Sequence, residues 1–514
     1  MTPALLISLP AISAEAFYYI APILLFSVLG FISMMWGSIA PLAAARGSVW
    51  LGILGSLVTL GLSYQMWGEL GGRGRLLFSD MVIADRFGLF FIALTAIITT
   101  LVLLITRDYL EREEIAIGEA YSLIFFGVVG IIGMVMSNDL MLLFICLELM
   151  SLAVYILTGF NRGNYTAIEG SLKYFVLGSF ASAFMLLGIA LIYGALGTTS
   201  MAAIGKIIGS AQGLDAVTAH LTDPRLTPQG LGIGMGLILL GFAFKIGSVP
   251  FHMWVPDVYQ GAIAPVTAFM ATGVKGAAFA ALIRFLVEAM PGLREVWAPM
   301  IAVLVVLTLV VGNIAALVQK DIKRMLAYSS IAHGGYAMMG LLAAQGGRSN
   351  EAVSSILLYM LVYAIMNVGA FAVVVMLYRK GQGEVTSLES YSGLGFKYPF
   401  VSAALSLFLI SLAGLPPSAG FVAKFNLFSA VVAAGYTWLV VIALITSAIS
   451  VYYYLRVVVQ LYMKTEEVEV TRYNTLLPSF VVALAVAAIL VIGVMPSAPF
   501  SFIQWARDSV VSLM

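Results

Sequence analysis

The chain has 514 residues, of which 61% are apolar and only 10% are charged, and its mean hydropathy is +1.04. A soluble domain carries about 25% charged residues, so this composition excludes a soluble enzyme and places the chain in lipid. The formal net charge of +1 argues against a nucleic-acid partner, and we interpret the Lys and Arg residues as marks of membrane topology.

The predicted elements are transmembrane helices, because apolar runs of about 20 residues recur along the chain. Runs of this length favour helices over a β-barrel. The N-terminal stretch carries no Lys or Arg ahead of its apolar run, so we expect the first helix to be retained and not cleaved as a signal. We predict about fourteen spans, at residues 17–36, 48–67, 87–106, 119–137, 139–159, 171–194, 231–249, 262–289, 298–318, 322–345, 352–378, 399–433, 436–462 and 475–495.

The predicted fold class is an all-α integral membrane protein with a single polytopic domain over residues 1–514. Two of its spans contain Gly, Pro and Lys together, at residues 243–256 and 414–425, and the only long polar connection is 197–230. Paired interruptions of this kind are typical of transporters built from inverted repeats. The two interrupted spans are the seventh and the twelfth, five helices apart. We therefore predict N-terminal helices at 1–118, inverted five-helix repeats at 119–289 and 298–462, and a last helix at 475–495.

Basic residues are unevenly distributed between the two sets of alternate loops. One set holds Arg46, Arg107, Arg112, Arg162, Lys320, Lys323, Arg324, Arg379, Lys380, Lys397, Lys464 and Arg472. The other holds Arg73, Arg75, Arg86, Lys206, Arg225, Arg294, Arg348 and Arg507. Because basic loops stay inside, the richer set is predicted to be cytoplasmic, and both termini periplasmic in a bacterial inner membrane.

We single out five charged side chains inside apolar runs. They are Glu148, Lys173, Lys245, Lys275 and Lys424. We predict that none of them has an opposite charge three or four residues away on its own helix. Any partner is therefore expected to come from another helix. An unpaired charge at mid-membrane costs at least roughly 2.5–3.5 kcal/mol, and such residues usually mark an ion route. Since a lysine can lose its proton on burial and regain it beside a carboxylate, the pattern predicts a proton relay.

The alternative for these residues is a static ion pair or a lysine that reaches out to the membrane surface, and Lys173 fits it best because it lies near its helix start. His252, inside the first interruption, and His333, in the tenth span, are predicted as further titratable links. A histidine bonded only to backbone carbonyls is the competing interpretation of both. No role is predicted for His220.

No redox centre or metal site is predicted on this chain. The single cysteine, Cys146, lies in an apolar run, where a buried inert thiol is the usual situation, and one thiolate cannot hold an iron–sulfur cluster. The His and carboxylate residues show no metal-ligand spacing. The glycines of 232–236 open an apolar helix with no preceding strand, which indicates helix packing and not a dinucleotide loop.

Two long motifs resemble those of a known family. The sequences PFHMWVPDVYQGAIAPVTAF at 250–269 and VGNIAALVQKDIKRMLAYSSIAHGGY at 311–336 are similar to signatures of the antiporter-like subunits of respiratory complex I. The resemblance covers essentially the whole chain. It implies fourteen helices, no bound cofactor, and proton translocation driven by quinone reduction elsewhere in the complex. By the same resemblance, Glu148, Lys245, Lys275 and Lys424 match the family's charged residues on the fifth, seventh, eighth and twelfth helices.

Within the family, the pattern looks like subunit N, because the M and L subunits typically read His-Thr-Trp-Leu-Pro-Asp at the first motif. Subunit M carries a glutamate where Lys424 stands, and subunit L continues into a long lateral helix for which the last roughly 20 residues are too few. The resemblance implies partner subunits that hold NADH, FMN, iron–sulfur clusters and quinone, and neighbouring antiporter-like subunits. Two alternatives remain open, a cation/proton antiporter subunit using the same lysines and a purely structural membrane subunit.

Overall fold

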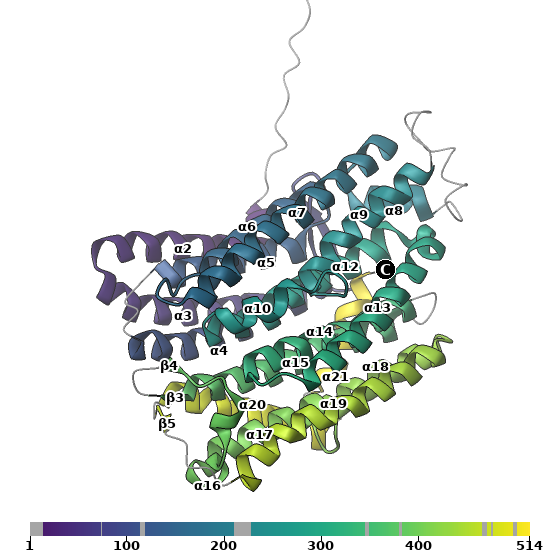
Figure 1. Ribbon diagram of the computed structural model, residues 1–514. Helices are drawn as coiled ribbons and strands as arrows, with labels where there is room; N and C mark the ends of the chain where they lie inside the picture. The colour runs from purple at the N-terminus through teal and green to yellow at the C-terminus, as the bar shows by residue number, and fades with distance from the viewer. Residues whose placement is uncertain are drawn as a thin grey trace, which may run out of the picture.

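The computed structural model describes residues 14–72, 74–113, 119–209, 228–344, 349–379, 383–464, 470–473, 476–496 and 501–513. Within these ranges, twelve helices are long and apolar enough to cross a membrane. The two other predicted spans correspond to a helix of 22 residues, α14, and to two shorter apolar helices, α17 and α18. The prediction of an all-α membrane protein with broken helices is confirmed (Figure 1).

The N-terminal part is a group of helices and one short hairpin. Its elements are α1 (Ala14–Tyr19), α2 (Ala21–Ile39), α3 (Pro41–Glu69), β1 (Arg75–Leu77), β2 (Val82–Ala84) and α4 (Arg86–Arg112). The strands β1 and β2 pair antiparallel directly before α4. Asp85 then caps α4 by accepting a hydrogen bond from the amide of Gly88. The hairpin was not predicted, because each of its strands has only three residues.

The first predicted repeat contains a broken helix and a distorted one. Its elements are α5 (Glu119–Met136), α6 (Leu140–Thr158), α7 (Tyr165–Leu196), α8 (Met201–Gly209), α9 (Pro228–Ile246), α10 (Trp254–Gly261), α11 (Ala264–Phe269), η2 (Met270–Val274), α12 (Lys275–Arg284) and η3 (Phe285–Ala289). The last four form one continuous span in which η2 and η3 are π-helical, a distortion frequent at functional sites. The predicted polar connection after α7 begins with the helix α8, whereas its residues 210–227, including His220, lie outside the described ranges.

The second half adds the other broken helix and a small sheet. Its elements are η4 (Pro291–Leu293), α13 (Arg294–Leu317), α14 (Ile322–Ala343), α15 (Ser349–Met376), β3 (Leu377–Arg379), β4 (Gly383–Glu384), η6 (Leu388–Tyr391), α16 (Leu394–Lys397), α17 (Pro399–Ala413), α18 (Ala419–Ala433), α19 (Thr437–Met463), β5 (Thr471–Arg472), α20 (Leu476–Val494), α21 (Phe502–Val510) and η7 (Val511–Leu513). The sheet has the antiparallel order β4-β3-β5. The C-terminal helix α21 packs on both α15 and α4.

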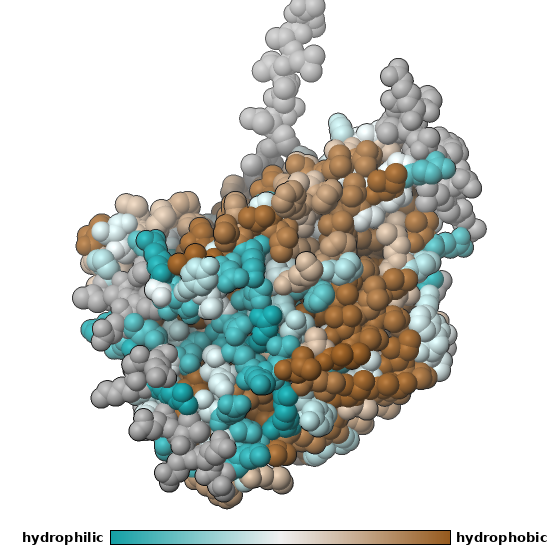
Figure 2. Space-filling view, in the orientation of Figure 1, coloured by the Kyte–Doolittle hydropathy of each residue, from teal (hydrophilic) through white to brown (hydrophobic). Residues whose placement is uncertain are grey.

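Three spans form the centre of the molecule. The most apolar windows of α4, the α11–η3 span and α15 are 89%, 100% and 94% buried, against 33–39% for α2, α3, α13 and α20. The central spans therefore meet protein on all sides, whereas the outer ones present apolar faces to lipid or to partner subunits. Figure 2 shows a hydrophobic surface over α7 and α13, with hydrophilic residues gathered toward the side on which β3, β4 and β5 lie.

Candidate functional site: buried lysines around α14

The first helix break separates α9 from α10. Gly247, directly after α9, has a φ of +79°, a conformation that favours glycine. A Cβ at this position would lie 2.8 Å from Cγ2 of Val255. The amide of Val249 donates to the hydroxyl of Thr308 on α13, at 3.0 Å. The break is thus held by its own backbone conformation and by a neighbouring helix, and it leaves Lys245 next to the end of α9.

Lys245 lies in a buried aromatic pocket and is 3% exposed. Its Nζ donates to the hydroxyls of Ser151 at 2.6 Å and Tyr155 at 3.1 Å, both on α6. The rings of Tyr155, Tyr174 and Phe244 lie 5.1, 5.6 and 5.7 Å from the same atom. The ammonium group is therefore held by hydroxyls and aromatic rings.

Glu148 lies one turn before Ser151 on α6 and is partly exposed. Its carboxylate accepts a hydrogen bond from the hydroxyl of Ser182 on α7. Among the described residues, no ion pair within 4 Å joins Glu148 to a lysine. Glu148 thus lies on the same helix as Ser151, which bonds Lys245, but Glu148 and Lys245 do not form an ion pair.

Lys275 begins α12, directly after the π-helical turn η2, and is 3% exposed. Its Nζ donates to the carbonyl oxygen of Ser330 at 2.6 Å and to its hydroxyl at 2.5 Å. The hydroxyl of Tyr363 on α15 donates to the same Ser330 oxygen at 2.7 Å. A Cβ on Gly334 would lie 3.2 Å from Cγ2 of Ile246 and 3.8 Å from this Nζ. Glycine here brings α14 close both to Lys275 and to the first break.

His333 continues the polar chain on α14, one turn after Ser330. Its Nδ1 lies 2.6 Å from the hydroxyl of Tyr359 on α15, and its Nε2 lies 3.3 Å from the hydroxyl of Tyr454 on α19. Tyr454 in turn bonds the hydroxyl of Ser329. Both ring nitrogens therefore face titratable or hydroxyl groups, which contradicts the competing prediction that His333 bonds only backbone carbonyls.

Lys424 occupies the second break in a similar way. Gly414, directly after α17, has a φ of +82°, and a Cβ there would lie 2.6 Å from Cδ of Lys424. Nζ of Lys424 donates to the carbonyl oxygen of Ala413 and to the hydroxyl of Ser447, each at 2.9 Å, and lies 4.9 Å from the ring of Tyr336. The C-terminal carbonyl of α17 is a favourable place for a cation, because the negative end of the helix dipole lies there.

Helix α14 contacts several of the candidate relay residues. It supplies Ser330 to Lys275, and it supplies His333 and the ring of Tyr336 to the second half. Among the described residues, Lys245, Lys275 and Lys424 form no ion pair with any carboxylate. Three of the predicted residues, Lys275, His333 and Lys424, therefore lie on or against α14. Lys245 lies against α6, one turn from Glu148.

The other two predicted residues lie elsewhere. Nζ of Lys173 pairs with Glu169 and with Asp257, each at 2.7 Å, and its side chain is 42% exposed. The prediction that no opposite charge lies within four residues is wrong for Lys173, because Glu169 occupies the i−4 position. His252 is half-buried in the turn of the first break, and its Nδ1 is a buried atom without a hydrogen-bond partner among the described residues.

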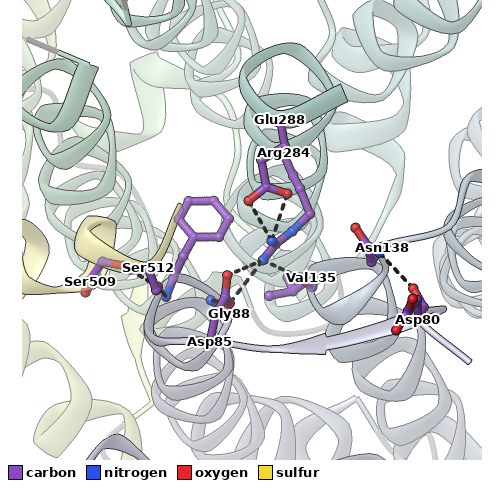
Figure 3. Close-up of polar contacts among 10 residues, drawn as sticks. Asp80, Asp85, Gly88, Val135, Asn138, Arg284, Glu288, Ser509 and Ser512 are labelled. Carbon is purple, nitrogen blue, oxygen red and sulfur yellow. Dashed lines mark hydrogen bonds and ion pairs between the residues drawn. The ribbon is translucent and has the colours of Figure 1, made fainter. Parts of the chain in front are cut away.

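A buried ion cluster near the other end of the α11–η3 span was missed by the sequence analysis (Figure 3). Nη2 of Arg284 bonds both oxygens of Asp85 at 3.1 Å, and Nη1 bonds both oxygens of Glu288 at 3.0 and 3.1 Å. The side chains of Arg284 and Asp85 are 1% and 0% exposed. The sequence does contain a signal for this ion pair, because Arg284 and Glu288 lie four residues apart within the predicted span 262–289.

A second missed feature is a polar cavity of about 1080 Å³ at the opposite end of the same span. Nζ of Lys323 bonds Glu384 at 2.6 Å, and Glu384 also accepts from the amide of Ala264, at the start of α11. Lys323 and Asp321 line this cavity together with Asn161 and other residues of the loop before α7. The loop before α7 and the segment that leads into α14 therefore share one cavity.

Comparison with known proteins decides the family. Residues 137–450 match the family model described as NADH:quinone oxidoreductase/Mrp antiporter, TM. NADH-quinone oxidoreductase subunit N of Trichlorobacter lovleyi is 42% identical over 488 residues, 95% of this chain and 96% of the relative. Subunit N of Chloroflexus aggregans is also 42% identical, over 88% of this chain and 89% of its own length. The chain belongs to the subunit N family of NADH-quinone oxidoreductase.

Solved structures agree with this assignment. A chain of respiratory complex I from Thermus thermophilus, solved with bound aureothin, has a TM-score of 0.76 and 30% identity, and the match covers 96% of this chain and 99% of that one. A chain of the Mrp complex from Dietzia has a TM-score of 0.79 at 19% identity, covering 96% and 97%, which shows a shared fold alone. The predicted resemblance to the antiporter-like subunit N of complex I is therefore confirmed, as are the fold class and the place of the chain as a proton-translocating membrane subunit of this enzyme.

Proposed function

We propose that the chain carries protons through the membrane along a relay of Glu148, Lys245, Lys275, His333 and Lys424, coupled to quinone reduction on other subunits of NADH-quinone oxidoreductase. One observation carries the proposal. The three relay lysines are buried in membrane-spanning segments, and their described partners are hydroxyl groups, carbonyl oxygens and aromatic rings.

These partners suit proton transfer better than a permanent ion pair. A buried ammonium group held by a carboxylate is stabilised in its charged form, whereas one held by neutral groups can give up its proton at a smaller cost. Hydroxyl groups also both donate and accept hydrogen bonds, so they can follow a change of charge on the lysine. Arginine lacks this ability because it stays charged in proteins. The five residues thus have the chemistry that a relay needs.

The two breaks support two related halves. Each break follows a helix that ends before a glycine with positive φ, at Gly247 and Gly414, and each has a lysine beside it. We propose that residues 119–289 and 298–462 are inverted repeats, with Lys245 and Lys424 at matching breaks. Lys275 and His333 would then connect the halves across α14.

Lys173 and His252 have lesser roles in this proposal. Lys173 is a partly exposed lysine with two carboxylate partners, so it forms a surface ion pair and is not a relay member. His252 remains a candidate link at the first break, because its half-buried imidazole is a titratable group in the turn between α9 and α10.

The setting of the chain follows from the same proposal. We propose that it holds no redox cofactor, that NADH, FMN, iron–sulfur clusters and quinone bind to partner subunits, and that neighbouring antiporter-like subunits pack on its apolar flanks. The membrane is then a bacterial inner membrane, with both termini periplasmic. The polar cavity beside Lys323 would open to the cytoplasm, where the richer set of basic loops lies.

Two substitutions of Lys245 in the intact complex test the relay. Lys245→Arg keeps a charge that can stack on Tyr155 and Tyr174 but cannot release a proton, and Lys245→Met removes the charge at similar volume. We expect both complexes to assemble and both to pump several-fold more slowly in proteoliposomes, measured by a pH-sensitive dye against quinone reduction. Normal pumping by Lys245→Arg would show that this residue is only a structural cation.

Thiol labelling tests the orientation. The background is a chain in which Cys146, the only cysteine, is replaced by serine. In this background, Lys320→Cys places a thiol on an exposed residue between α13 and α14. A second variant, Gln504→Cys, places a thiol on the exposed face of α21. We expect an impermeant thiol reagent added to intact spheroplasts to label only the position 504 variant, and to label the position 320 variant only after lysis. The reverse labelling pattern would show that the orientation is opposite to the one proposed.

A further inference from the structure

A small polar cavity lies between α15, α18 and the C-terminal helix α21, and we call it the outer cavity. It has a volume of about 270 Å³ and is lined by Glu351, Ser354, Ser355, Leu358, Asn426, Ser429, Ala430, Ala433, Ile503 and Arg507. Six of these side chains are polar or charged, and they lie on the first turns of α15, the last turns of α18 and the nine-residue helix α21. Glu351 and Arg507 are both exposed and carry opposite charges.

A stripe on α15 leads from this cavity to the relay. Glu351, Ser355, Tyr359 and Tyr363 follow one another at intervals of four residues, so they lie on one face of the helix, about 6 Å apart along its axis. The hydroxyl of Ser355 donates to the carbonyl oxygen of Glu351 at 2.7 Å. Ser355 is a wall of the cavity, and the next residue of the stripe, Tyr359, is buried.

The inner end of the stripe touches the relay at two points. The hydroxyl of Tyr359 lies 2.6 Å from Nδ1 of His333. The hydroxyl of Tyr363 donates to the Ser330 oxygen that also accepts from Lys275, at 2.7 and 2.5 Å. The polar groups of one helix thus extend from the buried lysine and histidine to a cavity wall, with one helical turn between Tyr359 and Ser355.

From this arrangement we propose that the outer cavity is the port through which the relay exchanges protons with the periplasm, and that Glu351 is its terminal proton-binding residue. The inference rests on the proposed relay and orientation. A proton leaves His333 through the hydroxyl of Tyr359, passes Ser355, and binds one carboxylate oxygen of Glu351, whose charge changes from −1 to 0. It then passes to bulk water, and the carboxylate regains its charge. Arg507 balances that charge across the cavity.

Blocking the cavity tests the port without altering any relay residue. Ser429→Cys, in a chain with Cys146→Ser, places a thiol on an exposed cavity wall, and a bulky impermeant methanethiosulfonate added from the periplasmic side would fill the space. Gln504→Cys is the matched control, because residue 504 lies on the same C-terminal helix outside the cavity lining. Both complexes are reconstituted intact, and pumped protons are measured per quinone reduced.

We expect modification of Ser429→Cys to lower proton pumping by at least half, reduction of the mixed disulfide to restore it, and modification of Gln504→Cys to have no effect. Glu351→Gln should show the same loss without any reagent, since glutamine cannot bind and release the proton. The port proposal would be wrong if the modified Ser429→Cys complex pumped normally, or if modification of the control lowered proton pumping equally. Lys275→Met, measured in parallel, separates the outcomes, because full pumping by that variant would instead refute the relay itself.

Discussion

Replacing Lys275 with methionine is expected to lower proton pumping about a hundredfold, the range in which a positioned proton-transfer group contributes to a rate. Lys275 lies on the one span whose apolar window is completely buried, and it contacts α14 at the residue that Tyr363 of α15 also contacts. Methionine fits the same space without charge, so assembly should be retained.

The measurement uses the assembled complex in proteoliposomes, with pumping and quinone reduction recorded together under a membrane potential. Moving one charge against 100 mV costs about 2.3 kcal/mol, so a site that cannot change its charge should stall most clearly when the potential is high. Lys206→Met is the matched control, because Lys206 is an exposed residue of α8 and the chemical change is identical. An assembled Lys275→Met complex that pumps at the rate of the control would exclude Lys275 from the pathway.

Much of the fold could be predicted because lipid leaves few alternatives. Apolar runs of about 20 residues can only be helices, and every predicted span corresponds to a helix or helix pair. The breaks could also be predicted, since glycine, proline and lysine seldom occur together in a membrane helix that runs without interruption. The short strands could not be predicted, because two or three residues give no period and their pairing depends on contacts far apart in sequence.

The candidate relay residues could be selected from the sequence, but the groups that they contact could not. A charge inside an apolar run identifies Lys245, Lys275 and Lys424 one at a time, whereas their actual partners are serine and tyrosine hydroxyls that are common in any membrane helix. The carboxylate of Glu148 accepts a hydrogen bond from Ser182 on α7, a partner that the sequence does not identify. The shared role of α14 could not be inferred, because helix packing places Ser330 and His333 between elements of both halves.

The second large effect is expected for Arg284→Met, which should destabilise the subunit by about 3–5 kcal/mol, the usual cost of breaking a buried ion pair from one side. Methionine removes five hydrogen-bond donors and leaves the buried carboxylate of Asp85 and the partly buried carboxylate of Glu288 without their cation. The cluster joins the end of the α11–η3 span to the start of α4 (Figure 3). Its loss should therefore loosen the helix that carries Lys275.

The neutral triple variant, Arg284→Met with Asp85→Asn and Glu288→Gln, decides whether stranded charge is the cause. Asparagine can keep the cap on Gly88, because its side-chain oxygen is an equally good acceptor there. The main cost of breaking a buried ion cluster is the charge that is left without a partner. The triple variant has no such charge, so we expect it to recover most of the loss in thermal melting of the purified complex. If it melts as early as Arg284→Met alone, the guanidinium acts through packing against Phe87, whose ring lies 5.1 Å from it, and not through its charge.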